Sequence, residues 1–276
     1  MDDTSAPPRH TRLTFHGPLS EDRAARMIGR LTAQTAPGAG VAPDIPETPV
    51  APDTPVAPGT VLDIGCGWGE FMLRLLEASP GSTGVGIDVD AEDLARGRAA
   101  AEARGLAGRV RFLRESARDT TRGPADLVLC LGASHALSDA PPPGHIGAAL
   151  RALRRLVAPG GRVVLGEGFW HRPPAPGELS AMWPGATVGE LPDLTGLVDL
   201  AVASGFRPVW IETASTGEWE DFESAYRSDV EEWLAAHPGH PLAEETRERV
   251  DRQRSRWLRS YREVMGLAYL TLAPVG

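Results

Sequence analysis

Residues 61–70 read Val-Leu-Asp-Ile-Gly-Cys-Gly-Trp-Gly-Glu. The first four residues predict an apolar strand that carries one acid, Asp63, and an amphipathic helix follows the stretch. Between them Gly65, Gly67 and Gly69 stand at a spacing of two. Because glycine has no Cβ, such a strand-to-helix turn exposes backbone N–H groups against which a ligand can lie directly. The stretch therefore predicts a ligand-binding loop at the carboxyl end of a strand.

The glycine spacing separates two classes of cofactor. The dinucleotide fingerprint G-x-G-x-x-G would place its third glycine at position 70, which is Glu70. A pyrophosphate also tolerates acids poorly, and Asp63 and Glu70 flank the loop. A ligand with a cationic end and ribose hydroxyls suits the loop better than a dinucleotide. A glycine-rich turn that binds nothing is the remaining alternative.

The composition limits the classes of function. The 276 residues suffice for one large domain, or for one domain with additions. The net charge of −9 argues against broad binding to nucleic acid phosphates and against an anionic membrane surface. No apolar run is long enough to span a bilayer and the N-terminus lacks the pattern of a signal peptide, so we expect a cytoplasmic protein. All 28 basic residues are arginine, a bias that fits a GC-rich bacterial genome.

The N-terminal part of the chain differs from the rest. Ser20 is a candidate helix N-cap, and apolar residues recur at helical spacing over residues 21–33. Residues 36–59 repeat Val-Ala-Pro among other prolines, which is typical of an extended linker. We therefore divide the chain into an N-terminal helical segment, a Pro/Ala-rich linker and an α/β domain: residues 1–35, 36–59 and 60–276.

From Thr60 onward strands and helices alternate with short connections, which predicts an α/β fold with a doubly wound parallel sheet. The expected strands are residues 61–64, 83–88, 110–113, 126–131, 162–167, 208–213 and 267–272. The expected helices between them are residues 69–78, 91–104, 144–157 and 194–204. Residues 218–236 and 242–265 are long, charged and helical in period, so a helical insertion over 218–265 separates the sixth strand from the seventh. It would lie over the edge of the sheet where ligands bind in such folds.

The stretch 61–70 resembles motif I of the class I S-adenosylmethionine (SAM)-dependent methyltransferases, an acid followed by Gly-x-Gly-x-Gly. Asp88 after the second strand and Leu-Val-Ala-Pro-Gly-Gly at 156–161 support the resemblance, which covers residues 60–274. It implies SAM as cofactor and a seven-stranded Rossmann-like sheet whose last strand enters antiparallel between strands five and six. Gly-Glu-Gly-Phe-Trp at 166–170 and the helical insertion resemble a group of uncharacterised bacterial small-molecule methyltransferases.

The resemblance implies a cofactor site. The glycine loop would lie against the methionine part of SAM, and Asp63 would help to hold the ammonium group. Asp88 is placed to accept both ribose hydroxyls, although a helix-capping role is the alternative, for which Asp90 is the better candidate. Ser116 stands where the family often has an aspartate near the adenine amino group, so the adenine contact is open between Ser116 and Ala117. The expected cofactor-binding residues are Asp63, Gly65, Cys66, Gly67, Gly69, Asp88, Val89, Ser116, Ala117 and Leu131.

Two residues are candidates for a catalytic base. His135 follows the fourth strand, where the resemblance implies that the chain passes close to the sulfonium. A neutral imidazole near pH 7 can remove a proton, and a structural capping role is the alternative. Glu167 ends the fifth strand between two glycines and could bind a polar substrate group, act as the base or cap a loop. The sequence does not decide between them.

Aromatic residues flank a proline-rich loop after the fifth strand, and we expect them to line the substrate pocket: Trp170, His171 and Trp183. His237 and His240 have no neighbouring cysteine or acid cluster, so no metal site is expected.

The sequence therefore predicts SAM-dependent methyl transfer to an oxygen, nitrogen or carbon nucleophile of a small molecule, with secondary metabolism as one setting. The N-terminal helix and the helical insertion would form a lid. The alternatives are a SAM-binding protein without methyl transfer, a methyltransferase acting on protein or RNA, and an NAD-dependent enzyme, which the glycine spacing disfavours. No nucleic acid or membrane partner is expected, and the oligomeric state is open.

Overall fold

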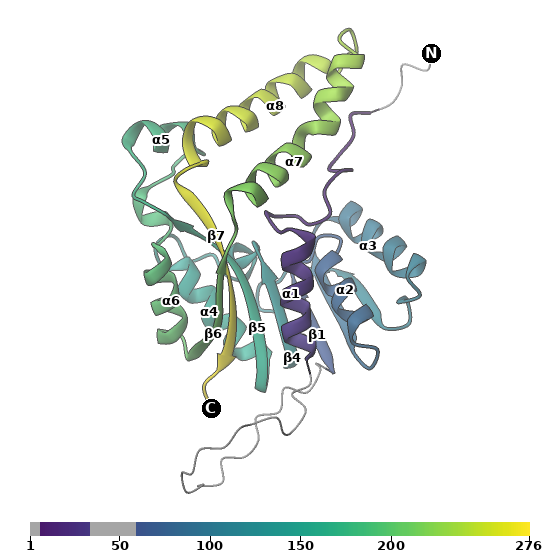
Figure 1. Ribbon diagram of the computed structural model, residues 1–276, viewed down its shortest axis with the longest axis vertical. Helices are drawn as coiled ribbons and strands as arrows, with labels where there is room; N and C mark the ends of the chain where they lie inside the picture. The colour runs from purple at the N-terminus through teal and green to yellow at the C-terminus, as the bar shows by residue number, and fades with distance from the viewer. Residues whose placement is uncertain (1–5, 34–58) are drawn as a thin grey trace, which may run out of the picture.

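The computed structural model describes residues 6–33 and 59–276 (Figure 1). The predicted Pro/Ala-rich linker lies outside the described residues, except for Gly59. Within the described ranges, no helix combines the length and the apolar character that crossing a bilayer requires.

Seven strands form one sheet in the order β3-β2-β1-β4-β5-β7-β6. The strands are β1 (Thr60–Ile64), β2 (Thr83–Asp88), β3 (Val110–Arg114), β4 (Ala125–Leu131), β5 (Val157–Trp170), β6 (Phe206–Thr213) and β7 (Met265–Pro274). The pairs from β3 to β5 are parallel, whereas β7 is antiparallel to both β5 and β6. The seven-stranded α/β fold and the antiparallel last strand are confirmed.

Eight α-helices in the described chain surround this sheet. They are α1 (Glu21–Thr32), α2 (Glu70–Ala78), α3 (Ala91–Ala103), α4 (His145–Leu156), α5 (Pro176–Ala181), α6 (Leu194–Ala203), α7 (Thr216–Ala236) and α8 (Ala243–Arg256). The predicted elements recur with shifts of a few residues, α5 lies where a proline-rich loop was expected, and two further differences concern element ends. β5 begins at Val157, and not at the expected residue 162, because Val157 already pairs with Ala125. The glycines at 160 and 161 lie in a register irregularity between this pair and the pair Leu127–Arg162. α8 ends at Arg256 and continues as one π-helical turn, Trp257–Tyr261, so the expected helix to residue 265 is too long.

Each face of the sheet carries its own apolar core, because successive strand residues point to opposite sides. Val163 and Leu165 of β5 face the core under α4 and α6, whereas Val164 faces the core under α1, α2 and α3. In Figure 1, α1 and α2 stand in front of the sheet, whereas α4 and α6 cover its other, rear face at the left of the view. The fold is thus a three-layer sandwich.

Helix α1 belongs to the front layer. Ser20 caps its N-terminus, since the Ser20 side chain accepts a hydrogen bond from the Arg23 N–H. Ala24, Met27 and Ile28 are buried in the front core together with α2 residues. The predicted helix is confirmed, and its packing makes it a structural part of the domain.

The inserted helices α7 and α8 project beyond the carboxyl ends of the parallel strands (Figure 1). They pack on each other through a small apolar cluster of their own, which consists of Val230, Trp233, Leu234, Ala243 and Val250. The chain from residue 6 to α1 runs beside α7 before it reaches the sheet (Figure 1). The insertion and this N-terminal segment therefore sit together at the edge where the glycine loop emerges.

Candidate functional site

The three glycines of the loop after β1 adopt the left-handed conformation that other residues avoid. Their φ angles are +60° at Gly65, +52° at Gly67 and +67° at Gly69. A Cβ at Gly65 would lie 2.4 Å from the Ala133 Cβ, so that position has no room for a side chain. The loop is consequently a bare backbone surface that presses against the chain after β4.

Asp63 lies at the end of β1, beneath the glycine loop. Its side chain is 5% exposed, and no basic side chain in the described parts of the chain pairs with it. Burial, and next the nearby charge of Asp88, raise the pKa of Asp63 to about 8. A buried acid in this state favours a cation, which would restore its charge.

Asp88, at the end of β2, holds the glycine loop in place and can still accept further hydrogen bonds. Its Oδ2 accepts a hydrogen bond from the Gly67 N–H at 2.8 Å, and its Oδ1 accepts one from the Asp90 N–H at 2.9 Å. Since each carboxylate oxygen can accept two hydrogen bonds, both could also receive a hydroxyl. Asp90 performs the helix-capping role, accepting from the Glu92 and Asp93 N–H groups.

The carboxyl end of β2 also presents an apolar surface. The Val89 side chain is 65% exposed, although it follows a buried strand. The Glu115 N–H donates to the Asp88 carbonyl at 3.0 Å, which holds the start of the 115–117 segment beside β2. Within that segment Ser116 is exposed and Ala117 is buried. Ser116 thus remains accessible and Ala117 offers only its backbone.

A cleft of about 130 Å³ opens over the loop. Five of its wall residues were expected to bind the cofactor: Asp63, Gly65, Cys66, Gly69 and Leu131. The opposite wall is the segment from Phe15 to Leu19, for which no binding role was expected. The segment carries only Phe15 and His16 as aromatic residues before the helix cap at Ser20, and no motif marks it as part of a site.

Trp68 and Arg96 hold this N-terminal segment in place. The Trp68 indole N–H donates to the Thr14 carbonyl at 2.9 Å, and the His16 ring stacks on the indole with 5.2 Å between centroids. The Arg96 guanidinium lies over the Trp68 ring and donates to the Leu13 carbonyl at 2.7 Å. Burial lowers the pKa of His16, so the segment presents a neutral imidazole to the cleft.

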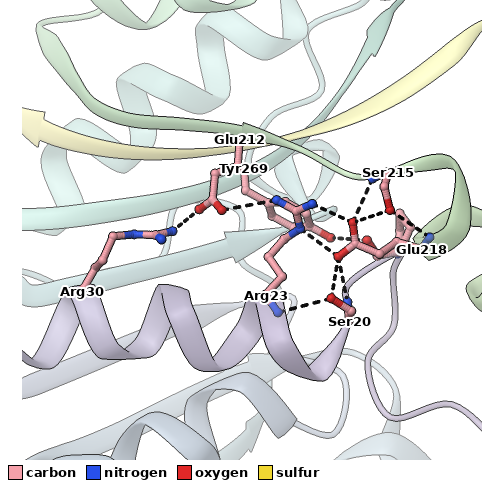
Figure 2. Close-up of polar contacts among 8 residues, drawn as sticks. Ser20, Arg23, Arg30, Glu212, Ser215, Glu218 and Tyr269 are labelled. Carbon is pink, nitrogen blue, oxygen red and sulfur yellow. Dashed lines mark hydrogen bonds and ion pairs between the residues drawn. The ribbon is translucent and has the colours of Figure 1, made fainter.

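Glu218 joins the N-terminal segment to the inserted helices, as Figure 2 shows. Its Oε1 accepts from the Ser20 hydroxyl at 2.7 Å, and its Oε2 accepts from the Ser215 N–H at 2.8 Å. Ser20 and Ser215 are the N-caps of α1 and α7, and the Arg23 guanidinium donates to both carboxylate oxygens. These donors outweigh burial and lower the pKa of Glu218 to about 2. One carboxylate therefore caps the start of both helices.

The two candidate bases occupy different environments. His135 is exposed on a short 3-10 turn after β4, Ser134–Leu137. Glu167 is 8% exposed and lies on the rear face of β5, opposite to the face that Asp63 occupies. Burial raises the pKa of Glu167, against smaller opposing effects of Ser134 and the Gly168 N–H, and its Oε2 makes no hydrogen bond within the described residues. Neither residue lines the 130 Å³ cleft.

The expected substrate-pocket residues are spread over two environments. Trp170 is 4% exposed and packs in a separate apolar cluster with Trp257 and Tyr261. Trp183 packs against the same cluster and lines a cavity beside it, and its indole N–H donates to the Glu190 carboxylate at 2.9 Å. His171 is exposed, with its ring edge-on to Phe169. The structure does not bring the three side chains into one pocket.

The residues around the loop fit SAM. The bare backbone of the loop and the buried Asp63 suit an amino acid moiety with an ammonium group. The spare acceptor capacity of Asp88 suits ribose hydroxyls, and the exposed Val89 suits the face of a purine. These contacts lie in chain order along the carboxyl ends of β1 and β2.

Comparisons with known proteins agree with this geometry. A family model described as a methyltransferase domain matches residues 62–163. The uncharacterized protein YjhP of Escherichia coli strain K12 is 29% identical over 213 residues, which is 77% of this chain and 83% of YjhP. A SAM-dependent methyltransferase from Geobacter sulfurreducens, solved with S-adenosyl-L-homocysteine, has a similar fold, with a TM-score of 0.74, 24% identity and coverage of 97% of this chain and 98% of its own. A SAM-dependent methyltransferase from Thiobacillus denitrificans, also with S-adenosyl-L-homocysteine, gives a TM-score of 0.74, 23% identity and coverage of 98% and 100%.

The glycine loop with its buried acid, the sheet with an antiparallel last strand and the domain match lead to one assignment. Residues 62–163 match a methyltransferase domain, the chain has the fold of the class I SAM-dependent methyltransferases, and its site fits S-adenosyl-L-methionine as cofactor.

Proposed function

We propose that the chain methylates an oxygen, nitrogen or carbon nucleophile of a small molecule. Bound SAM supplies a methyl group on a positively charged sulfur, which is open to in-line displacement. The task left to the chain is to align the nucleophile, to exclude water and to remove a proton where the nucleophile carries one.

The observation that carries this proposal is the cover over the cleft. Residues 15–19 close one side of the space above the glycine loop, and the segment is fastened by Trp68, Arg96 and Glu218. A folded protein or an RNA would need an open approach to the methyl group, whereas a small molecule can be enclosed. The net charge of −9 further disfavours RNA.

We assign proton removal to His135 and a supporting role to Glu167. His135 is exposed just after the carboxyl end of β4. It follows Ala133 by two positions, and Ala133 lies against Gly65 of the glycine loop. Glu167 lies behind β5, and its raised pKa favours the protonated form, which is a poor base. Glu167 is close enough to Ser134 to influence it, so it can support the 3-10 turn that carries His135.

The substrate class can be tested with methyl-labelled SAM and a cell extract divided by dialysis. We expect label to enter the dialysable fraction and S-adenosyl-L-homocysteine to accumulate in proportion. Label that entered only the retained protein or RNA would overturn the small-molecule proposal. If SAM binds but no S-adenosyl-L-homocysteine forms and no label enters either fraction, the alternative of a SAM-binding protein without methyl transfer would be favoured.

The base can be tested with His135→Gln and Glu167→Gln once an acceptor is found. For an acceptor that must lose a proton, we expect His135→Gln to lower kcat by roughly a hundredfold or more, the range for general bases, and to remove the acidic limb of its pH profile. Glu167→Gln, which keeps the shape and a neutral side chain, should retain that limb. A loss of the limb in Glu167→Gln alone would reverse the assignment.

A further inference from the structure

A second cavity, which we call the arginine cavity, lies between the N-terminal segment and the inserted helices. Its volume is about 290 Å³. Its lining includes His10, Tyr226 and the arginines Arg9, Arg227, Arg249, Arg252 and Arg256. It is therefore bounded by the inserted helices and by the N-terminal segment, whose residues 15–19 line the cofactor cleft.

The charge of its lining is one-sided. Five of the lining residues are arginines and none is an aspartate or a glutamate, although the whole chain has a net charge of −9. Such a concentration of like charge costs free energy unless it is neutralised by neighbouring or bound anions.

Acids outside the lining neutralise three of these arginines. The buried Arg227 pairs with Glu223 at 2.9 Å. Arg9 pairs with Asp90 at 2.7 Å and also with Glu92, and Arg252 has a long contact of 3.4 Å with Glu248. These contacts neutralise the charges of Arg227 and Arg9, and they neutralise the charge of Arg252 only weakly.

Arg249 and Arg256 make no ion pair within the described residues. The two side chains line the same cavity from one helix, two turns apart on α8. A guanidinium presents several N–H donors in a plane, the arrangement that carboxylate and phosphate oxygens accept best. These two arginines form the unneutralised part of the cavity.

The cavity adjoins the cofactor cleft through two histidines. The His10 ring lies 4.3 Å from the Tyr226 ring and 5.6 Å from the His16 ring, between centroids. His16 in turn lines the cofactor cleft. The buried Nδ1 of His10 has no hydrogen-bond partner within the described residues, so the shared wall also leaves a polar atom unused.

We propose that the arginine cavity binds the carboxylate or phosphate group of the methyl acceptor. The acceptor is then an anionic small molecule: Arg249 and Arg256 hold its charged group, and its other end extends past His10 and His16 into the cofactor cleft. This assignment rests on the proposed small-molecule substrate, while the anion site itself can be measured without any turnover.

The first experiment measures binding of inorganic phosphate and of citrate by calorimetry, at constant ionic strength because screening weakens such contacts. Arg249→Gln and Arg256→Gln should each weaken binding roughly tenfold, as expected for loss of a charged hydrogen bond. Arg259→Gln is the matched control, since Arg259 is exposed nearby, has no ion pair within the described residues and does not line the cavity. SAM affinity should stay unchanged in all three variants.

Equal weakening in Arg259→Gln, or no measurable anion binding by the unaltered protein, would overturn the site. The second experiment compares acceptors found in the label-transfer assay. Anionic acceptors should show a roughly tenfold higher KM in Arg249→Gln, with kcat little changed. An unchanged KM, with phosphate binding lost, would mean that the cavity serves a separate anion and would overturn only the assignment to the acceptor.

Discussion

The cofactor loop and its cover are built by different means. The loop from Asp63 to Gly69 depends on backbone conformation, with three left-handed glycines and one buried acid at neighbouring positions in the chain. The cover depends on side-chain contacts between distant positions, such as the Ser20–Glu218 hydrogen bond, which joins residues 198 positions apart. The loop can therefore be recognised from a short stretch of sequence, whereas the contacts that build the cover cannot. Changes at the loop should therefore remove function, whereas changes at the cover should alter stability and access.

The largest effect is expected for Gly65→Ala. Its Cβ would meet Ala133 at 2.4 Å, so the loop must move, and SAM affinity should fall on the order of a hundredfold. The matched control is Gly105→Ala, because Gly105 has a similar φ of +68° with nothing within 4 Å of an added Cβ. Gly105→Ala should cost about 1–2 kcal/mol of stability with unchanged SAM binding. Calorimetry and thermal unfolding measure both, and equal SAM affinities would refute the role of the loop.

The next effect tests the cover through Glu218→Gln. Loss of this charge leaves Arg23 with only Glu212, and both side chains of the Arg23–Glu218 pair are mostly buried. We expect a loss of about 3 kcal/mol in the free energy of unfolding. Glu220→Gln on the same helix breaks only an exposed pair with Arg262 and should cost less than about 1 kcal/mol. Denaturant unfolding of the two variants gives the comparison, and similar losses would contradict the special role of Glu218.

The pKa of Glu218 gives this prediction a pH dependence. Its folded pKa of about 2 lies below the ordinary glutamate value of 4.5, so its stabilising effect is present above pH 4.5 and is lost as the pH falls towards 2. The difference in stability between the unaltered protein and Glu218→Gln should shrink over that range. A difference that stayed constant would show that hydrogen-bond geometry alone, without the charge, stabilises the contact.

Asp63 should release a proton when SAM binds. With a pKa of about 8 in the free protein, Asp63 is largely protonated at pH 7, and an ammonium group favours its ionised form. We expect most of one proton to be released per SAM at pH 7, and none from Asp63→Asn. Calorimetry in buffers of different ionisation enthalpy counts the protons. Equal counts in the two proteins would place the ammonium away from Asp63.

The same residue affects the stability of the free protein with the opposite sign to Glu218. Because the folded pKa of Asp63 is raised, its protonated form is favoured, and that contribution to stability is fully present below the ordinary pKa of 3.8 and is lost as the pH rises from there through about 8. Asp63→Asn should therefore resist alkaline unfolding better than the unaltered protein, although it binds SAM less tightly.

The smallest effect is expected for Arg12→Gln. Arg12 pairs with Glu232 of α7, but the two side chains are 48% and 65% exposed. Such pairs contribute less than about 1 kcal/mol, so unfolding and SAM affinity should both stay close to those of the unaltered protein. A loss comparable to that of Glu218→Gln would show that the outer contacts, and not the buried carboxylate, hold the cover.

Local patterns allowed much of the fold to be predicted. Alternating apolar runs gave the strands, the glycine loop gave the cofactor, and the family resemblance gave the antiparallel β7. The predicted lid roles of the N-terminal helix and the insertion remain predictions. The described contacts place residues 15–19, and not α1, over the cleft.

The site was less predictable where side chains from distant elements meet. Trp170 follows Glu167 by three positions, yet pleating and the turn after β5 send its side chain into a core with Trp257. His16 gave no periodic or motif signal, because its position in the cleft depends on Trp68 and Arg96. The arginines of α8 alternate with acids, a pattern typical of a solvated helix face, and only the packing of α8 against α7 reveals the cavity.

The reversed direction of β7 has a practical consequence for handling the protein. Met265 pairs with Trp170 near the inserted helices, whereas Pro274 pairs with Phe206 at the opposite rim of the sheet. An affinity tag or a surface-immobilisation handle after residue 276 would thus project away from both cavities. The same handle before residue 6 would crowd Pro8 and Arg9 at the mouth of the arginine cavity.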